Sequence, residues 1–212
     1  MSPFTPPLSR RRLLMASTAA VLVPRWGAAA EMATPVQEEG PFYPRSFPLD
    51  VDNDLVRVSG RDGQAAGDIL HVIGRVLDVN GRPVQGAQLE IWQCDRFGVY
   101  HYVNDRSGRQ DPDFQGYGRT IAAADGAYRF RTIRPVPYPG RTPHIHFIVR
   151  PPAAPRLTTQ MYVAGEPRND SDFLLRSIRD PAARARVIVP LEAAGDIENG
   201  ALLGKFDIIL GA

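Results

Sequence analysis

The chain has 212 residues, the length of one domain, and 43% of them are apolar, which is enough for a sizeable core. Its 20 prolines and 19 glycines favour a β architecture rich in turns over a helical bundle, because both residues weaken helix interiors. The formal net charge of +2 includes four arginines in residues 1–30, and the chain has a single lysine, Lys205. A nucleic-acid-binding protein is therefore excluded, since it needs a clustered basic face.

The first thirty residues predict an export signal. Arg10-Arg11-Arg12 precedes an apolar stretch of roughly eleven residues, and Ala28-Ala29-Ala30 follows as a cleavage site of small residues. The stretch is shorter than the ~20 residues of a membrane-spanning helix, which favours a removed signal over an anchor. The arginine pair before Leu13-Leu14 resembles a twin-arginine signal, and the alternative is an ordinary secretory signal. Either signal delivers the protein to the periplasm or the exterior of a bacterium.

Residues 31–66 are predicted to form an extended N-terminal arm laid over the domain formed by residues 67–212. Prolines and glycine dominate the segment 34–48, which contains Gly40-Pro41-Phe42-Tyr43-Pro44. A regular helix is excluded there, because each proline lacks an N–H group and restricts the residue before it.

Short apolar runs separated by turn residues predict seven or eight short strands and an all-β antiparallel sandwich. The clearest run alternates, with Leu89 and Ile91 on one face and Glu90 and Trp92 on the other. Asn80-Gly81 is typical of a hairpin turn. The predicted strands are residues 69–77, 87–93, 127–131, 144–149, 160–163, 184–189 and 205–210.

One segment, residues 172–180, is predicted to be a short helix. Asp170 or Ser171 would cap it, and Phe173 and Leu174 would lie on its apolar stripe. The single cysteine, Cys94, excludes an intramolecular disulfide and a thiolate zinc site, and we expect it to be a small buried residue.

Two histidines stand at the start of a predicted strand, as His144-Ile145-His146. Residues i and i+2 of a strand point to the same face, so both imidazoles are placed to bind one metal ion. The alternative is a pair of exposed or partly buried histidines without a ligand. Upstream, Pro137 and Pro139 hold the backbone of Tyr138 in a fixed shape, which suits a side chain that must be aimed at a ligand.

A second tyrosine, Tyr100, follows the end of another predicted strand. Phenolate is a hard, strongly donating anion that favours iron(III), and a trivalent ion can deprotonate a phenol whose free pKa is ~10. The iron(II) triad of two histidines and a carboxylate would need an acidic residue beside the histidines, and the sequence has none at a comparable spacing. His71 and His101 are expected to be structural or surface residues.

The chain resembles the intradiol ring-cleavage dioxygenases, the family that includes protocatechuate 3,4-dioxygenase and catechol 1,2-dioxygenase. The matching segments occur in the family's order and cover most of the chain after residue 30. The most specific match is Arg141-Thr-Pro-His-Ile-His-Phe147 with Pro137-Tyr-Pro139 before it and Thr159-Gln-Met-Tyr162 after it. The other matching segments are residues 34–43, 74–78, 81–93, 98–100 and 128–130.

The resemblance implies a β-sandwich that holds one iron(III) through four residues. These are Tyr100, Tyr138, His144 and His146. Tyr138 is the ligand implied to leave when the substrate chelates the metal.

The resemblance also implies roles beside the metal. Arg141 would lie next to the substrate, where its permanent charge stabilises negative charge on the ring, with Gln160 behind it fixing Arg141 or the reacting oxygen. Trp92 would lie near the iron, more as a core residue than a catalytic one. Pro41 and Tyr43 of the arm would line the substrate pocket or simply cover the sheet.

The sequence departs from the family's pattern at Gly140, where protocatechuate-type enzymes usually carry a tryptophan against the substrate. The loop from Tyr138 to His144 is also shorter than in those subunits. Both departures leave the implied metal ligands intact and indicate a roomier mouth for the substrate.

The implied function is an iron(III)-dependent dioxygenase that opens a catechol-type ring between its two hydroxyl-bearing carbons, giving a cis,cis-muconate-type diacid. The expected partners are a small aromatic substrate and dioxygen, with no nucleic acid and no membrane once the signal is removed; a homo-oligomer is compatible with the sequence. One alternative is a non-enzymatic transthyretin-like binding module, which the segment 74–87 also resembles. The other is a zinc hydrolase using the two histidines, which lacks an identifiable third ligand.

Overall fold

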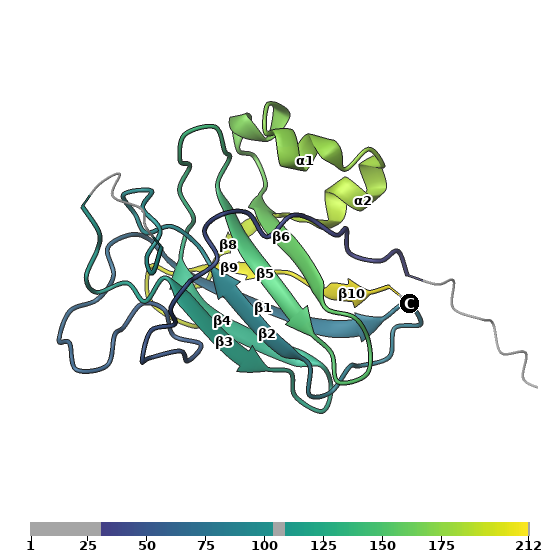
Figure 1. The fold of residues 1–212 in the computed structure, drawn as a ribbon, viewed down its shortest axis with the longest axis horizontal. Coiled ribbons are helices and arrows are strands. Elements are labelled where there is room, and N and C mark those ends of the chain that lie inside the picture. The colour runs from purple at the N-terminus through teal and green to yellow at the C-terminus, as the bar shows by residue number, and fades with distance from the viewer. Residues whose placement is uncertain (1–30, 104–108, 212) are drawn as a thin grey trace, which may run out of the picture.

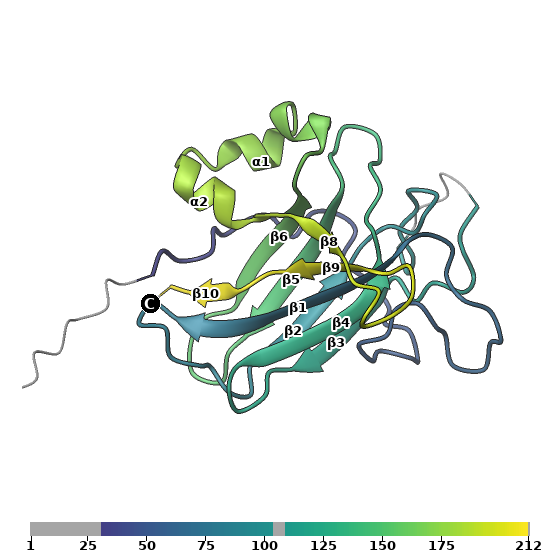
Figure 2. The same ribbon diagram turned by 180° about the vertical axis from the view of Figure 1, so that it is seen from behind.

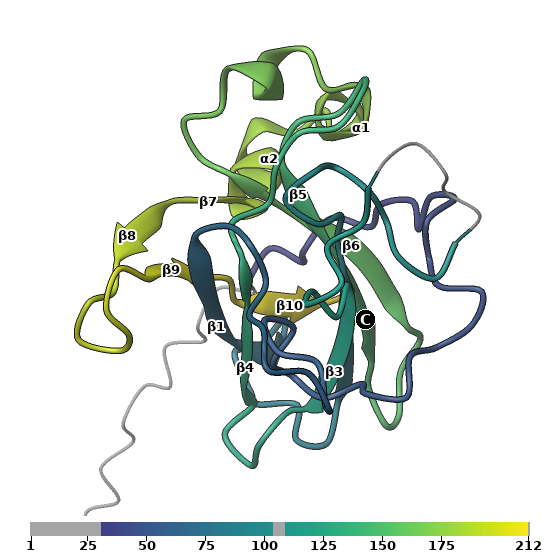
Figure 3. The same ribbon diagram turned by 90° about the vertical axis from the view of Figure 1, so that its left-hand side faces the viewer.

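The computed structural model describes residues 31–103 and 109–211. Two five-stranded sheets stack face to face, which confirms the predicted β-sandwich, and Figure 3 shows the two layers side by side. The predicted export signal in residues 1–30 lies outside the described residues. Within the described ranges, no helix has the length and apolar character needed to cross a membrane.

The first sheet is built around the long strand β1, and Figure 2 shows it facing the viewer. β1 pairs antiparallel with β4 on one edge and parallel with β9 and β10 on the other, and β8 extends the sheet beyond β9. The parallel pairs make the sheet mixed, which the residue patterns did not indicate. The strands are β1 (Ile69–Asp78), β4 (Ala127–Ile133), β8 (Leu191–Ala193), β9 (Leu202–Lys205) and β10 (Ile208–Leu210).

The second sheet has the order β3-β2-β5-β6-β7, and its outer face is turned to the viewer in Figure 1. Its neighbours are antiparallel except β6 and β7, which are parallel. The strands are β2 (Gln88–Trp92), β3 (Tyr117–Ile121), β5 (His144–Arg150), β6 (Leu157–Val163) and β7 (Ile188–Val189).

Three short helical segments lie between β6 and β7, over one end of the second sheet (Figure 1). They are η1 (Pro167–Asp170), α1 (Phe173–Ser177) and α2 (Pro181–Arg186).

The strand predicted at residues 184–189 is wrong in its first half. Asp180 accepts hydrogen bonds from the N–H groups of Ala182 and Ala183, and Pro181 occupies the first turn. This arrangement starts α2 and keeps the chain helical to Arg186. The predicted cap of α1 is also wrong, because the side chain that caps it is Asp172.

The strand predictions missed β3, β8 and most of β9, and the strand predicted at residues 205–210 is broken between β9 and β10. Gly118 accounts for the omission of β3, because glycine usually interrupts a strand. The glycine is required there, since a Cβ at residue 118 would lie 2.6 Å from the carbonyl oxygen of Asp52. The predicted hairpin-type turn at Asn80-Gly81 forms and is followed by a short antiparallel bridge between Leu77 and Pro83, although β1 and β2 themselves belong to different sheets.

The core between the sheets confirms the alternation predicted for residues 87–93. Leu89 and Ile91 lie in the main apolar core, whereas Trp92 lies on the outer face of the second sheet in a separate aromatic cluster with Tyr117. Cys94 is buried, as expected.

The N-terminal arm covers the outer face of the second sheet, as Figure 1 shows. The backbone N–H of Gln37 donates to the carbonyl of Thr158 on β6, and Phe42 and Tyr43 pack against the outer aromatic cluster. Residues 31–66 contain no helix and no strand, but turns interrupt the segment, and Leu55, Val56 and Ala65 enter the main core. The first part of the arm forms one wall over β5, the strand that carries the two histidines.

Gly74 of β1 allows the backbone between its parallel partners β9 and β10 to approach closely. β9 and β10 are separated by a short break at Phe206, whose carbonyl oxygen lies against Gly74 and accepts the hydroxyl of Tyr128. A Cβ at residue 74 would overlap that carbonyl group. Gly74 is therefore required by the close approach of a neighbouring backbone.

We predict that Gly74→Ala lowers the free energy of unfolding by about 3 kcal/mol, the upper part of the range for overpacked sites. Urea unfolding of the metal-free protein measures it. Gly195→Ala is the matched control, because a Cβ there meets no atom within 4 Å; its effect should stay within about 0.5 kcal/mol. Equal stabilities of the two variants would contradict the assigned contact.

Candidate active site

Two buried imidazoles face each other on the outer face of β5. His144 Nε2 and His146 Nε2 are 3.2 Å apart, as expected for residues i and i+2 of one strand. His144 Nδ1 lies 2.7 Å from the carbonyl oxygen of Thr142, which can only accept, so Nδ1 carries the proton and Nε2 presents a lone pair. The ring of Trp92 stacks on His146 with centroids 4.6 Å apart.

The surroundings of the histidine pair keep both rings uncharged. Burial lowers the pKa of His144 to about 3 and lowers that of His146 well below its usual value, with the Arg141 guanidinium acting in the same direction. Both rings are therefore neutral near pH 7. Among the described residues, His146 Nδ1 is buried with no hydrogen-bond partner. His146 Nε2 can donate to His144 Nε2, or in its other tautomer present a second lone pair to the same position, where a cation would contact both nitrogens, so the donors fit a metal ion.

Two tyrosines complete a closed ring of four aromatic side chains. The ring centroids are 4.8 Å apart for His144–His146, 5.4 Å for Tyr138–His144, 5.5 Å for Tyr100–Tyr138 and 6.1 Å for Tyr100–His146. The four residues predicted as metal ligands thus come together from three separate segments of the chain.

Both tyrosines are protonated before any cation binds. Burial raises the pKa of Tyr100 well above its usual value, and burial also raises the pKa of Tyr138, against the opposing effect of the Arg141 guanidinium. A highly charged metal ion reverses this preference, because it stabilises the phenolate directly. In the part of the chain that the structure describes, no group of three or more His, Cys, Asp or Glu is placed to hold a metal. The tyrosines are therefore the side chains that can extend the histidine pair to a set of four donors.

Arg141 lies beside the tyrosine–histidine ring and is largely buried. Its Nη1 is 3.3 Å from the hydroxyl of Tyr138 and 3.4 Å from His144 Nε2, and its Nη2 donates to Gln160 Oε1 at 2.7 Å. Gln160 Nε2 in turn donates to the carbonyl oxygen of Glu38 in the N-terminal arm. The predicted neighbours Arg141 and Gln160 are therefore in direct contact.

A cavity of about 450 Å³ opens onto these groups. Of the residues predicted to contact a substrate, Pro41 and Gly140 line it. Tyr43 and Trp92 are not among its lining residues. They contact each other edge to face at 5.0 Å, and the hydroxyl of Tyr43 donates to Glu90 at 2.6 Å. They support the layer that carries His146 and do not form the cavity wall.

Several residues of the site were not predicted from the sequence. Phe42 of the arm stacks on Tyr100 with centroids 4.5 Å apart. The stripe predicted for residues 172–180 is wrong for Phe173, which is 63% exposed and lines the cavity, whereas Leu174 and Leu175 are the buried residues of α1. A helix of five residues is too short for its apolar stripe to be read from periodicity.

Gly140 leaves one side of the cavity open. Its φ of +82° is a conformation that other residues rarely adopt, and a Cβ at this position would meet no atom within 4 Å. The space predicted from the absence of a larger side chain is therefore present.

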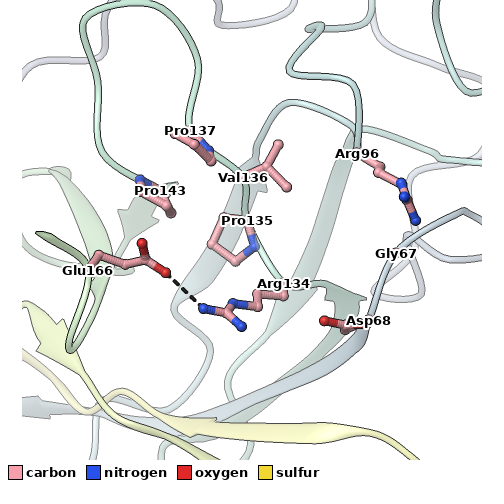
Figure 4. A pocket seen from close by; sticks show the side chains of 9 residues that line it. All are labelled: Gly67, Asp68, Arg96, Arg134, Pro135, Val136, Pro137, Pro143 and Glu166. Atoms are coloured by element: carbon pink, nitrogen blue, oxygen red, sulfur yellow. Dashed lines mark hydrogen bonds and ion pairs between the residues drawn. The ribbon is translucent and has the colours of Figure 1, made fainter. Parts of the chain in front are cut away.

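A second cavity, of about 490 Å³, lies beneath the ends of the loop that carries Tyr138. Figure 4 shows its wall of Pro135, Pro137 and Pro143, and the ion pair of Arg134 with Glu166 at 2.8 Å. In the part of the chain that the structure describes, no histidine or tyrosine lines this cavity. The donors for a metal converge in the first cavity and not in this one.

The other two histidines are structural, as expected. His71 is buried between Glu198, 2.9 Å from its Nε2, and Arg129, 3.2 Å from its Nδ1. His101 Nε2 lies 3.1 Å from the carboxylate of Asp95.

Comparison with known proteins gives a consistent result. A family model described as dioxygenase matches residues 38–212. The chain is 38% identical to the protocatechuate 3,4-dioxygenase beta chain of Burkholderia cepacia, over 76% of this chain and 72% of that one. It is 34% identical to the hydroxyquinol 1,2-dioxygenase of Corynebacterium glutamicum, over 72% of this chain but only 53% of that relative. The dioxygenase domain of a dioxygenase carbohydrate-binding fusion from Streptomyces sp. SirexAA-E superposes with a TM-score of 0.66 and 35% identity, over 85% of this chain and 99% of the other.

The low pKa of His144 predicts how the stability of the metal-free protein depends on pH. Below pH ~6.5 the unfolded chain binds a proton at this residue, whereas the folded protein does so only near pH 3. The free energy of unfolding should therefore fall as the pH falls from 6.5, by up to about 1.4 kcal/mol per pH unit for this residue. Urea unfolding at pH 7 and pH 5 should show a smaller loss for His144→Gln than for the unchanged protein; an identical loss would show that His144 is not buried as a neutral ring.

Proposed function

The chain belongs to the intradiol ring-cleavage dioxygenase family, and on that basis we propose that it cleaves a catechol-type ring between its two hydroxyl-bearing carbons. We further propose that Tyr100, Tyr138, His144 and His146 hold one iron(III). Dioxygen is the second substrate, and both of its atoms enter the product, a cis,cis-muconate-type diacid.

The observation that carries the proposal is the convergence of two neutral imidazoles and two tyrosines around one buried position. Two histidines alone would suit several metals, but two phenolates favour a hard trivalent ion. Iron(III) bound there would supply a Lewis acid that holds both catechol oxygens and draws electron density from the ring.

The side chains of the chain itself have separate tasks in this proposal. Tyr138 lies on the rim of the cavity, and its hydroxyl oxygen would accept a proton as the substrate gives up its hydroxyl protons. Arg141 keeps a positive charge 3.3 Å from that oxygen, where it stabilises negative charge on the substrate. Phe42 and Pro41 of the arm, with Phe173 of α1, bury the ring of the substrate and exclude water.

The predicted export signal would place this activity outside the cytoplasm. N-terminal sequencing of the protein recovered from a bacterial periplasm tests this, since a chain beginning at Met1 in that fraction would contradict removal of residues 1–30. The substrate would then be an aromatic compound from the surroundings of the cell.

The test of function is incubation of the iron-loaded protein with catechol and labelled dioxygen. We expect a diacid carrying both labelled atoms, identified by mass spectrometry. Tyr100→Phe should lose bound iron and product together, by more than about a hundredfold, because losing a hydrogen bond to a metal ligand already costs about 10–100-fold.

Tyr128→Phe is the matched control for this substitution. Tyr128 is also a buried tyrosine, but it lies between the sheets and bonds the carbonyl of Phe206. It should retain iron and activity. Full iron and full activity in Tyr100→Phe would contradict the assignment of the ligands.

The open space beside Gly140 predicts tolerance of bulky ring substituents. The unchanged protein should turn over 4-tert-butylcatechol, and Gly140→Trp should lower kcat/KM for it relative to catechol by at least about tenfold, the low end of what a few misplaced methylene groups cost. Gly140→Ala also places a side chain on a backbone of positive φ, but without the bulk of tryptophan. It therefore separates the effect of backbone strain from steric exclusion of the substrate. An unchanged substrate ratio in Gly140→Trp would show that substituents do not pass this residue.

A further inference from the structure

We propose that Asp172 is a positioning residue for the ring-cleavage site, because one carboxylate fixes both the Arg141 guanidinium and the helix that forms the mouth of the cavity. The role of Arg141 in this inference rests on the function proposed above. Asp172 does not line the metal position and was not predicted from the sequence.

One oxygen of Asp172 holds the segment that enters β5. Oδ2 accepts from Arg141 Nε at 2.8 Å and from the backbone N–H of Thr142 at 2.9 Å. The same Thr142 carbonyl that accepts from His144 Nδ1 belongs to this anchored segment. Oδ2 therefore fixes the base of the arginine side chain and the backbone next to the first histidine.

The other oxygen begins the helix α1. Oδ1 accepts from the N–H groups of Leu174 and Leu175, at 3.1 and 2.9 Å. Phe173 is the first residue of α1, and its ring lies 5.6 Å from Arg141 Cζ. The position of the helix and the position of the guanidinium are thus set by the two oxygens of one side chain.

Burial makes this carboxylate a strong anchor. The side chain of Asp172 is fully buried, and among the described residues it is the one carboxylate bonded to Arg141. Burial alone opposes its ionisation, but hydrogen bonds from Arg141, Leu175 and Thr142 hold its pKa below the usual value. It is therefore a buried anion with four donors, an arrangement in which orientation is tightly defined.

The three nitrogens of the Arg141 guanidinium contact different partners. Nε is committed to Asp172 and Nη2 to Gln160, which leaves Nη1 aimed at Tyr138 and His144. Without the anchor at Nε the guanidinium is free to rotate, and small displacements of a charged group reduce its effect on the reacting atoms. Loss of the anchor should lower the rate of the reaction with dioxygen without removing the metal or preventing the substrate from binding.

The decisive variant is Asp172→Asn. Asparagine is a good helix cap, so α1 should persist. Its single carbonyl oxygen cannot accept on both sides, and its NH₂ group must face either the Arg141 and Thr142 donors or the helix donors. We expect kcat per bound iron to fall about 10–100-fold with little change in KM, the pattern of an interaction made in the transition state. The spectrum of the anaerobic catechol complex should be unchanged.

Asp180→Asn is the matched control. Asp180 caps α2 through Ala182 and Ala183 in the same way, but it has no contact with Arg141. This variant should keep the kcat of the unchanged protein. Equal kcat values for Asp172→Asn and Asp180→Asn would overturn the proposal.

A measurement on the metal-free protein separates this proposal from the proposed function. The Nε–H of Arg141 should give a slowly exchanging ¹⁵N-edited NMR signal, which Asp172→Asn should lose and Asp180→Asn should keep. If the unchanged protein opens no catechol, the proposed function fails while this signal still decides whether Asp172 holds the guanidinium. If Asp172→Asn does not fold, Asp172→Ser keeps a helix cap without an anion and is tested identically. A retained signal in Asp172→Ser, or in Asp172→Asn with its carbonyl oxygen still capping α1, would contradict the anchoring role.

Discussion

Two neutral imidazole nitrogens held 3.2 Å apart in a buried site are the constraint on which the rest of the structure depends. They arise from one strand, because β5 sends Ile145 and Phe147 into the core and His144 and His146 to the opposite face. The core residues fix the strand, and the strand fixes the spacing of the donors. In the metal-free protein one of these nitrogens can donate to the other, and in the other tautomer both lone pairs point to one place, which is why we propose a metal there.

The remaining parts of the site are brought to this strand by tertiary packing. Gln37 of the arm donates to the Tyr162 hydroxyl and to the carbonyl of Leu174, and so joins the arm, β6 and α1. The arm and the loop with Tyr138 contain no helix or strand, and α1 has only five residues, so their positions depend on such side-chain contacts. The site therefore combines a rigid floor in the sheet with walls that side-chain contacts hold, which is a common way to place catalytic groups on loops over a scaffold.

Sequence reasoning predicted the parts of this structure that depend on local pattern. Alternation gave the inward and outward faces of β2, and the spacing of His144 and His146 gave the donor pair. The α2 helix was missed, although Asp180-Pro181 is a helix start in the sequence, because the short run after it was interpreted as a strand. The role of Asp172 could not be predicted, because its hydrogen bond to Arg141 joins residues 31 positions apart. A periodic sequence pattern does not indicate a contact over such a separation.

The most direct test of the central claim, that two tyrosines and two histidines bind iron(III), is the visible absorption spectrum of the iron-loaded protein before and after anaerobic addition of catechol. We predict a broad tyrosinate-to-iron(III) band, with absorption extending to longer wavelength when catechol is added, because a bound catecholate would give up an electron to iron(III) more readily than a tyrosinate does. An iron-loaded sample without such a band would show that the tyrosines are not ligands and would contradict the account.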